Sequence, residues 1–125
     1  MEEKINQGIG GLTEKICKIL DDKKAMNIQV IDVGHLTIVA EQFVIASARS
    51  TLQVRTLCDE LEERLEAEGV AALRKDGHQG GRWVVLDYGH VIVHIFHEQE
   101  REYYNLERLW MDGSNQHGYP EDAQP

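Results

Sequence analysis

Six histidines are the first candidates for metal chemistry in this sequence of 125 residues. His94 and His97 have an HxxH spacing, and His90 lies four residues before His94. The run HVIVHIF is predicted to be a β-strand, where a rise of about 3.3 Å per residue separates His90 from His94 by roughly 13 Å. Alternation along the strand also places His97 on the face opposite His94. We therefore predict neither a metal site nor a cofactor, and interpret these histidines as polar residues near a sheet rim or an interface.

Two aspartates at the ends of predicted strands, Asp32 and Asp87, are the candidates for phosphoryl-transfer chemistry. Two-metal catalysis of that kind needs acids close together on adjacent strands. A carboxylate at a strand end more often begins a turn or accepts a hydrogen bond from a backbone N–H. We predict no catalytic residues and keep a metal-dependent nucleotidyl- or phosphoryl-transfer enzyme as the alternative hypothesis.

Hydroxyl side chains gather in SARST, residues 47–51, between a predicted strand and a predicted helix. No GxSxG motif surrounds them, so a nucleophilic serine is not indicated. Ser50 and Gln53 instead have the spacing of a capping box, in which the hydroxyl and the amide each satisfy a backbone N–H at the helix start. Binding of an anion at this N-terminus, beside Arg49, is a less favoured interpretation.

Aromatic residues are few, but most of them lie late in the chain. Trp83 and Phe96 are expected to belong to the core. The segment before a polar C-terminal stretch carries four large side chains, which are Tyr104, Leu106, Leu109 and Trp110. A small domain has limited interior volume for them, and an apolar patch rimmed by Arg101, Glu107 and Arg108 is typical of a protein interface. This segment therefore predicts a partner-binding surface.

A mixed sheet with helices against it must position these residues. Strands are predicted at 27–33, 43–47, 70–75, 82–87 and 90–96. The last two are joined by Tyr88-Gly89 and are expected to form an antiparallel hairpin. Parallel pairing through a right-handed crossover is expected between 43–47 and 70–75 if these two strands adjoin. The sequence thus predicts an α/β fold with a sheet of about five strands.

Helical periodicity accompanies these strands. Apolar residues from Ile5 to Leu20 recur at spacings of three and four, which predicts an amphipathic helix that ends near Lys23 and is firm from about Leu12. A second stripe predicts a helix from Ser50 to a C-terminal cap at Gly69. Residues 98–110 are expected to contain a helical turn or two.

Charge, apolar runs, cysteines and length limit the kinds of protein that this sequence can be. The net charge of −9 disfavours broad binding to nucleic acid and suits a basic partner. The longest apolar runs fall far short of the roughly 20 residues of a membrane span, and the N-terminus does not resemble a signal peptide, so a cytoplasmic protein is expected. Cys17 and Cys58 lack metal-type spacing and are expected to be reduced thiols. The length predicts a single domain over residues 1–112, followed by a flexible polar tail over 113–125.

The late stretch GGRWVVLDYGHVIVHIFHEQEREYYNLERLW resembles the signature of ribosomal silencing factors, the Iojap-like family. The similarity lies in a G-x-W strand start, an LDxGxxxVHxF hairpin and an RxxYxLExLW segment. Upstream, IDV, FVIAS and the S-x-x-Q-V helix start are also similar, so that the resemblance covers about residues 12–112. Glu41 and Gln42 depart from the family's usual D-Y-F, which weakens the expectation of an interface at that corner.

The resemblance implies a fold like that of nucleotidyltransferases without their catalytic acids, and a translation repressor that is not an enzyme. It implies binding to large-subunit ribosomal protein number fourteen, which would block joining of the small subunit, with a further role in large-subunit biogenesis. Pairing of the same late surface into a homodimer, when the ribosome is absent, is an additional expectation. Phe96 is among the residues that would support the partner-binding surface. The residues expected at that surface are Trp83, Asp87, His94, Arg101, Tyr104, Leu106, Glu107, Leu109 and Trp110.

Overall fold

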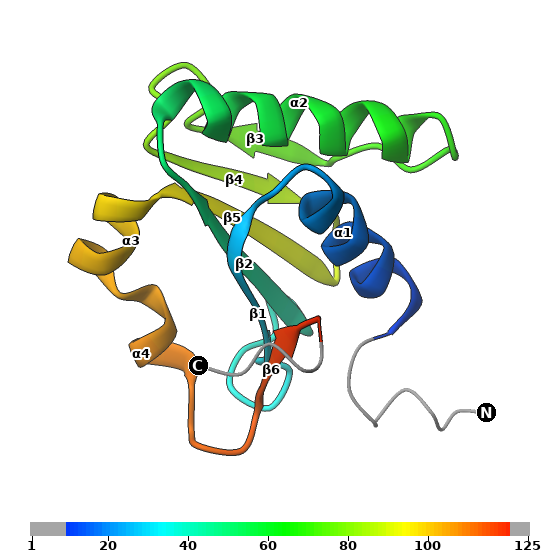
Figure 1. Ribbon diagram of the computed structural model, residues 1–125. Coiled ribbons are helices and arrows are strands. Elements are labelled where there is room, and N and C mark those ends of the chain that lie inside the picture. Colours follow the sequence, from blue (N-terminus) through cyan, green and yellow to red (C-terminus); the bar gives the residue numbers. More distant parts are fainter. Residues whose placement is uncertain (1–9, 121–125) are drawn as a thin grey trace.

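The computed structural model describes residues 10–120, which form a mixed sheet with helices on both faces (Figure 1). The strands are β1 (Met26–Asp32), β2 (Gln42–Ala48), β3 (Arg74–Asp76), β4 (Trp83–Asp87), β5 (Val91–His97) and β6 (Gln116–Tyr119). The helices are α1 (Gly11–Asp22), α2 (Thr51–Glu66), α3 (Glu98–Tyr104) and α4 (Leu106–Trp110). The strand order is β3-β4-β5-β2-β1-β6. The predicted α/β class is confirmed, with six strands in place of about five.

The larger core lies between one face of the sheet and the helices α1 and α2. Both predicted apolar stripes point into it, as shown by the full burial of Ile16, Leu20, Leu61 and Leu65. Each such side chain contributes roughly 1.5–3 kcal/mol when it leaves water. In the described part of the chain, no helix is long and apolar enough to cross a membrane. The predicted start of the first helix at Ile5 lies outside the described residues.

The ends of α2 follow the sequence signals. Ser50 Oγ accepts a hydrogen bond from the backbone N–H of Gln53 at 3.0 Å, which confirms the predicted N-cap. The Gln53 amide oxygen accepts from Arg49 N–H at 3.2 Å, one residue earlier than in a standard capping box. At the other end Gly69 has φ +86°, and its N–H donates to Glu66 while Val70 N–H donates to Leu65. This is the Schellman pattern that favours glycine.

The predicted strand at 70–75 is shifted and shortened. β3 comprises only Arg74–Asp76, is exposed along its length and pairs antiparallel with β4 at the sheet edge. It does not adjoin β2, whose parallel neighbour is β5, with Phe43 opposite Ile92. β5 is buried over six of its seven residues and suits the interior of the sheet, whereas a charged RKD strand suits an edge. The hairpin of β4 and β5 is as predicted.

The polar stretch after residue 112 was expected to be flexible, but part of it is a strand. β6 pairs antiparallel with β1, with Ile28 opposite Tyr119 and Ile31 opposite Gln116. The Gly, Asn and Pro content disfavours local order, yet the free edge of β1 supplies backbone partners that composition does not reveal. Residues 121–125 of the expected tail lie outside the described part of the chain.

Candidate partner-binding surface

A second, smaller core occupies the sheet face opposite α1 and α2. Its fully or largely buried members are Ile31, Val33, Ala40, Phe43, Ile45, Ile92 and Phe96. Four partly buried side chains pack against it, and they are Trp83, Val85, Leu106 and Trp110. Two of these come from the sheet and two from α4. The short helices α3 and α4 therefore cover only part of this face, which leaves aromatic side chains at its margin.

Aromatic rings connect these helices to the sheet. Trp83 stacks on Phe96 with ring centroids 4.8 Å apart, and the Tyr104 ring lies 5.0 Å from Trp83. Farther along the face, Trp110 meets Phe43 edge to face at 5.2 Å. Such pairs contribute about 0.5–1.5 kcal/mol each beyond the area they bury. α3 is thus anchored through Tyr104 and α4 through Trp110.

His94 lies beneath these rings. Its side chain is 7 % exposed, and its Nδ1 accepts a hydrogen bond from Trp83 Nε1 at 3.1 Å. Nε2 therefore carries the proton of the neutral ring, and it has no hydrogen-bond partner among the described residues. Burial lowers the pKa of His94 from 6.5 to about 4. A neutral, buried histidine supports the aromatic rings above it and does not itself offer a surface contact.

Arg101 and Glu107, both predicted at the surface, form a mostly buried connection between α3 and α4. Arg101 Nε donates to Glu107 Oε2 at 2.8 Å, and the two side chains are 11 % and 17 % exposed. Arg101 Nη1 also donates to the carbonyl of Met26 at 3.3 Å and to Ser47 Oγ at 3.1 Å. One guanidinium thus connects both helices to the ends of β1 and β2.

Asn105 separates the two helices. Its backbone adopts the left-handed conformation, with φ 49° and ψ 53°, which asparagine tolerates better than most residues. The chain therefore changes direction between Tyr104 and Leu106, and α4 starts on a new axis. This turn lets Leu106 and Trp110 face the sheet while Leu109 faces solvent.

Large apolar side chains remain exposed along this side of the molecule. We call them the exposed apolar surface, and they are Leu36, Ile38, Val39, Tyr103, Tyr104, Leu109 and Met111. Tyr103 and Leu109 are 80 % and 75 % exposed, and Ile38 is fully exposed. The first three belong to the loop between β1 and β2. His35 in that loop contacts Asp112 at 3.1 Å, which places the loop beside the end of α4. Large exposed apolar side chains that lie on neighbouring elements are typical of an interaction site.

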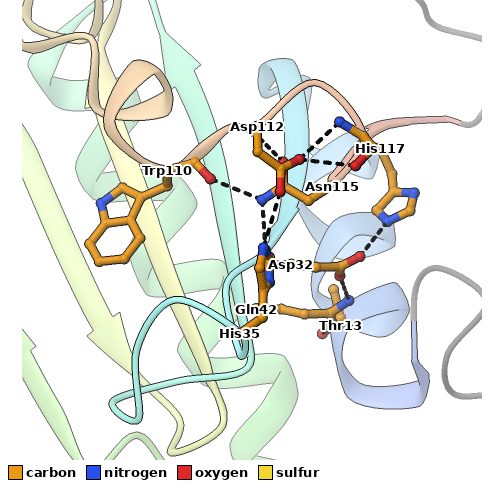
Figure 2. A network of polar contacts seen from close by, with 9 residues as sticks. Thr13, Asp32, His35, Gln42, Trp110, Asp112, Asn115 and His117 are labelled. Carbon is orange, nitrogen blue, oxygen red and sulfur yellow. Dashed lines mark hydrogen bonds and ion pairs between the residues drawn. The ribbon is translucent and has the colours of Figure 1, made fainter.

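Asn115 fixes the end of α4 to the sheet, as Figure 2 shows. Its buried side-chain NH2 donates to the carbonyls of Asp32 at 2.8 Å and Trp110 at 2.9 Å. Its amide oxygen accepts from Asp112 N–H at 2.8 Å. These three bonds hold the turn between α4 and β6 against β1.

The Asp32 carboxylate continues this polar network toward α1 (Figure 2). One oxygen accepts from Gln42 Nε2 at 2.7 Å, and the other lies 3.0 Å from His117 Nε2. Thr13 of α1 donates to the Gln42 amide oxygen at 2.6 Å. The Asp32 carboxylate therefore has two side-chain partners, whereas a strand-end carboxylate more often accepts from a backbone N–H.

Asp87 is remote from both Asp32 and the aromatic rings. Its Oδ1 accepts from Gly89 N–H at 2.8 Å and so shapes the β4–β5 turn, at the opposite end of β4 from Trp83. β4 and β1 are separated by β5 and β2, which places their ends roughly 14 Å apart. The two ions of a two-metal site lie only about 3.5–4 Å apart, so the acids that bind them must be close together. The geometry therefore gives no support to the alternative transferase hypothesis.

Of the residues predicted at the surface, Trp83, Tyr104, Leu106 and Trp110 lie together on this face. Phe43, the loop residues 36–39, Tyr103 and Met111 were not among the residues predicted at the surface. The loop carried a usable signal, because three large aliphatic residues in six positions after Gly34 are unusual for a solvent-facing connector. No pattern in the sequence indicated that Phe43 meets Trp110.

Comparison with known proteins identifies the family. The family described as "Ribosomal silencing factor during starvation" matches residues 6–124. The chain belongs to the ribosomal silencing factor family. The resemblance expected from the hairpin and the RxxYxLExLW segment is thus confirmed, and the names of family members point to a regulatory factor rather than an enzyme.

Individual ribosomal silencing factors agree with this assignment. The protein of that name from Halalkalibacterium halodurans is 39% identical over 93 residues, which cover 74% of this chain and 80% of the relative. The Bacillus subtilis protein is 39% identical over 92 residues, which cover 74% of this chain and 78% of the relative. An Iojap-related mitochondrial protein of Arabidopsis thaliana is 35% identical over 112 residues, covering 82% of this chain and 61% of its own.

Solved structures have the same fold. A crystal structure of a Chromobacterium violaceum protein superposes with a TM-score of 0.75 at 31% identity, covering 82% of this chain and 88% of the other. A crystal structure of a Bacillus halodurans protein superposes with a TM-score of 0.72 at 35% identity. The match covers 79% of this chain and 92% of the other. The mixed sheet and its flanking helices are therefore the fold of the family.

Proposed function

We propose that this protein is a translation repressor that binds the large ribosomal subunit through ribosomal protein number fourteen and sterically prevents the small subunit from joining. It acts in the cytoplasm, without chemistry and without a cofactor. The observation that supports the proposal is the exposed apolar surface in a member of the ribosomal silencing factor family. Aromatic packing of α3 and α4 against the sheet holds this surface in place.

Rigidity is what makes this surface suitable for binding. Tyr104 and Trp110 are anchored by rings of the sheet, and Arg101 connects both helices to β1 and β2. Association costs less when the contact residues are already ordered. Tyr103 and Leu109 can therefore serve as preformed apolar anchors, of the kind that supplies most of the energy at interfaces.

Charge supports the same partner class. The chain has a net charge of −9, and ribosomal proteins as a class are basic. Opposite charge accelerates encounter and suppresses wrong partners, while the apolar anchors supply the affinity. The predicted surface residues then divide by role. Trp83, Tyr104 and Leu109 are proposed contacts, whereas His94, Arg101 and Glu107 support them from beneath. Asp87 keeps its expected role only as a peripheral contact.

Co-sedimentation tests the proposal. The purified protein is expected to pellet with free large subunits and not with assembled 70S ribosomes. Leu109→Asp is expected to weaken binding at least ten-fold, since an apolar anchor becomes a charge, which corresponds to about 1.4 kcal/mol. Leu52→Asp is the matched control, because Leu52 is 65 % exposed on α2, on the other side of the sheet.

Binding to 70S ribosomes, or to neither form, would contradict the proposal, as would equal losses in the two leucine variants. We further propose that the exposed apolar surface pairs with a second copy when ribosomes are absent. Sedimentation equilibrium should then show a dimer for the wild type and for Leu52→Asp, and a monomer for Leu109→Asp. A wild-type protein that stays monomeric at high concentration would remove the dimer without affecting the ribosomal proposal.

A further inference from the structure

Three metal-ligating side chains meet on the face of the sheet that carries α2, away from the exposed apolar surface. Cys58 and Asp59 are consecutive residues of α2, and His78 belongs to the loop between β3 and β4. One ligand atom of each, the thiol sulfur, a carboxylate oxygen and a ring nitrogen, lies within 4.8 Å of the other two. His78 Nε2 is 2.8 Å from Asp59 Oδ1. Three donors of different chemistry therefore lie near enough to one another for one ion to reach all three.

The loop that carries His78 is held in place by features independent of the histidine. Gly77 has φ +82°, and a Cβ there would come 2.1 Å from the Trp83 carbonyl oxygen, so only glycine fits. Arg55 of α2 donates to the Gln79 carbonyl at 3.3 Å. These contacts fix the loop against α2. His78 is thereby presented to Asp59 and Cys58 by the fold, which reduces the entropy that ligand assembly would otherwise cost.

A fourth donor stands one helical turn beyond the cysteine. Glu62 Oε1 lies 3.8 Å from Cys58 Sγ and also accepts from Lys75 Nζ at 3.0 Å. The Glu62 side chain is 19 % exposed, and that of His78 is 32 % exposed. The site is thus closed by protein on the side of the buried Cys58 side chain. It is open to solvent on the side of His78 and Asp59, where an ion can enter.

We propose that Cys58, Asp59 and His78 bind one Zn²⁺ ion, with Glu62 as the fourth ligand. Thiolate, imidazole and carboxylate are the three ligand types of protein zinc sites, and bond lengths of about 2.0–2.3 Å in a tetrahedron separate the donors by about 3.3–3.8 Å. The 3.8 Å between Cys58 Sγ and Glu62 Oε1 lies at the upper end of that range, whereas the 2.8 Å between His78 and Asp59 is shorter, as expected of a hydrogen bond that the ion would replace. Ion binding would therefore move these side chains, and Glu62 would exchange its contact with Lys75 for the ion.

The ligand chemistry selects the ion. A thiolate favours zinc over magnesium or calcium, which prefer all-oxygen shells. On binding, the Cys58 thiol gives its proton to solvent, His78 coordinates as the neutral ring, and the carboxylates of Asp59 and Glu62 need no proton change. The ion would bridge α2 and the β3–β4 loop, so its effect would be on the stability of this edge of the sheet.

Cobalt titration of the untagged full-length protein tests the site, because tetrahedral Co²⁺ bound to a thiolate shows a charge-transfer band and intense visible bands. One equivalent of Co²⁺ is expected to produce both, and one equivalent of Zn²⁺ to remove them. Cys58→Ser should abolish the charge-transfer band. Cys17→Ser is the matched control, since Cys17 is also a buried free cysteine and lies outside the cluster.

His78→Gln tests whether a loss of metal binding could result from unfolding. His78 lies in a partly exposed loop, so this substitution should leave the fold intact. Its circular dichroism should match the wild type while Co²⁺ affinity falls at least ten-fold. Zn²⁺ should raise the melting temperature of the wild type and of Cys17→Ser but not of His78→Gln. Absence of the charge-transfer band in the wild type, its persistence in Cys58→Ser, or an equal response to Zn²⁺ in all variants would overturn the site.

Discussion

The indole N–H of Trp83 donates to Nδ1 of His94 at 3.1 Å, so that a partly buried ring at the margin of the sheet is hydrogen-bonded to a neutral, buried histidine. The bond defines which His94 nitrogen carries the proton and orients the rings of Phe96 and Tyr104 that pack on Trp83. The aromatic support of α3 therefore depends on the protonation state of one imidazole.

Lowering the pH is expected to destabilise the protein through His94. Its pKa is about 4 in the folded state against 6.5 in the reference state, so the unfolded chain binds the extra proton first. The stabilisation is complete above pH 6.5 and is lost as the pH falls toward 4. Between pH 7 and pH 5 the loss amounts to roughly 2 kcal/mol.

Urea denaturation at pH 7 and pH 5 measures this effect. The wild type should lose more unfolding free energy than His94→Phe, which has no group to protonate there. His90→Gln, an exposed substitution on the neighbouring turn, is the control and should respond to pH as the wild type does. Equal pH responses in the wild type and His94→Phe would remove His94 as the source.

Replacing Arg101 by methionine is expected to lower the free energy of unfolding by roughly 2–3 kcal/mol, because Glu107 then remains largely buried without its partner. The substitution removes three hydrogen bonds that connect α3 to α4, Met26 and Ser47. Chemical denaturation monitors the loss. Arg108→Met, at an exposed position of α4, should change stability by less than about 0.5 kcal/mol. Equal effects of the two substitutions would show that the buried network contributes little.

Asn115→Ala is expected to release the segment between α4 and β6. The substitution leaves the carbonyls of Asp32 and Trp110 without their donor and should cost roughly 2 kcal/mol. Hydrogen exchange of a peptide spanning residues 111–120 should accelerate, while exchange in α2 stays unchanged. Ser114→Ala, at an exposed position of the same turn, is the control. Unchanged exchange in Asn115→Ala would mean that the strand pairing of β6 alone holds this segment.

Ile38→Ser tests whether the β1–β2 loop belongs to the proposed ribosomal interface. Ile38 is fully exposed, so the free energy of unfolding should change by less than about 0.5 kcal/mol. Binding to large subunits is expected to weaken about five-fold, since an apolar contact of about 1 kcal/mol is lost. Leu73→Ser is the control, because Leu73 is 70 % exposed beside β3. Undiminished binding by Ile38→Ser would confine the interface to α3 and α4.

Much of the fold was predictable because its signals are local. The period of the leucines in α2, the spacing of Ser50 and Gln53 and the short β4–β5 turn all depend on residues a few positions apart. β6 was missed because its partner β1 lies more than eighty residues earlier in the chain, and nothing within HGYP itself indicates pairing.

The sequence indicated which segment would form the candidate surface, but not which of its side chains would face solvent. Of the four large side chains expected in an exposed patch, Tyr104 and Leu109 are exposed, whereas Leu106 and Trp110 are partly buried against the smaller core. Arg101 and Glu107 were expected at the surface and are mostly buried. Their burial accompanies the ion pair that they form across the left-handed turn at Asn105, a contact that the residue types alone do not reveal. The exposed loop at 36–39 was overlooked because a connector carries no periodicity that would indicate which side chains face solvent.

The pairing of β6 with β1 also affects how the protein is made. Residues 28–31 are synthesised more than eighty residues before their outer hydrogen-bond partners, residues 116–119. Closing so long a loop is slow compared with local helix formation. A nascent chain can therefore assemble the α1–α2 side of the sheet first, whereas the outer edge of β1 stays unpaired until residues 116–119 have been synthesised.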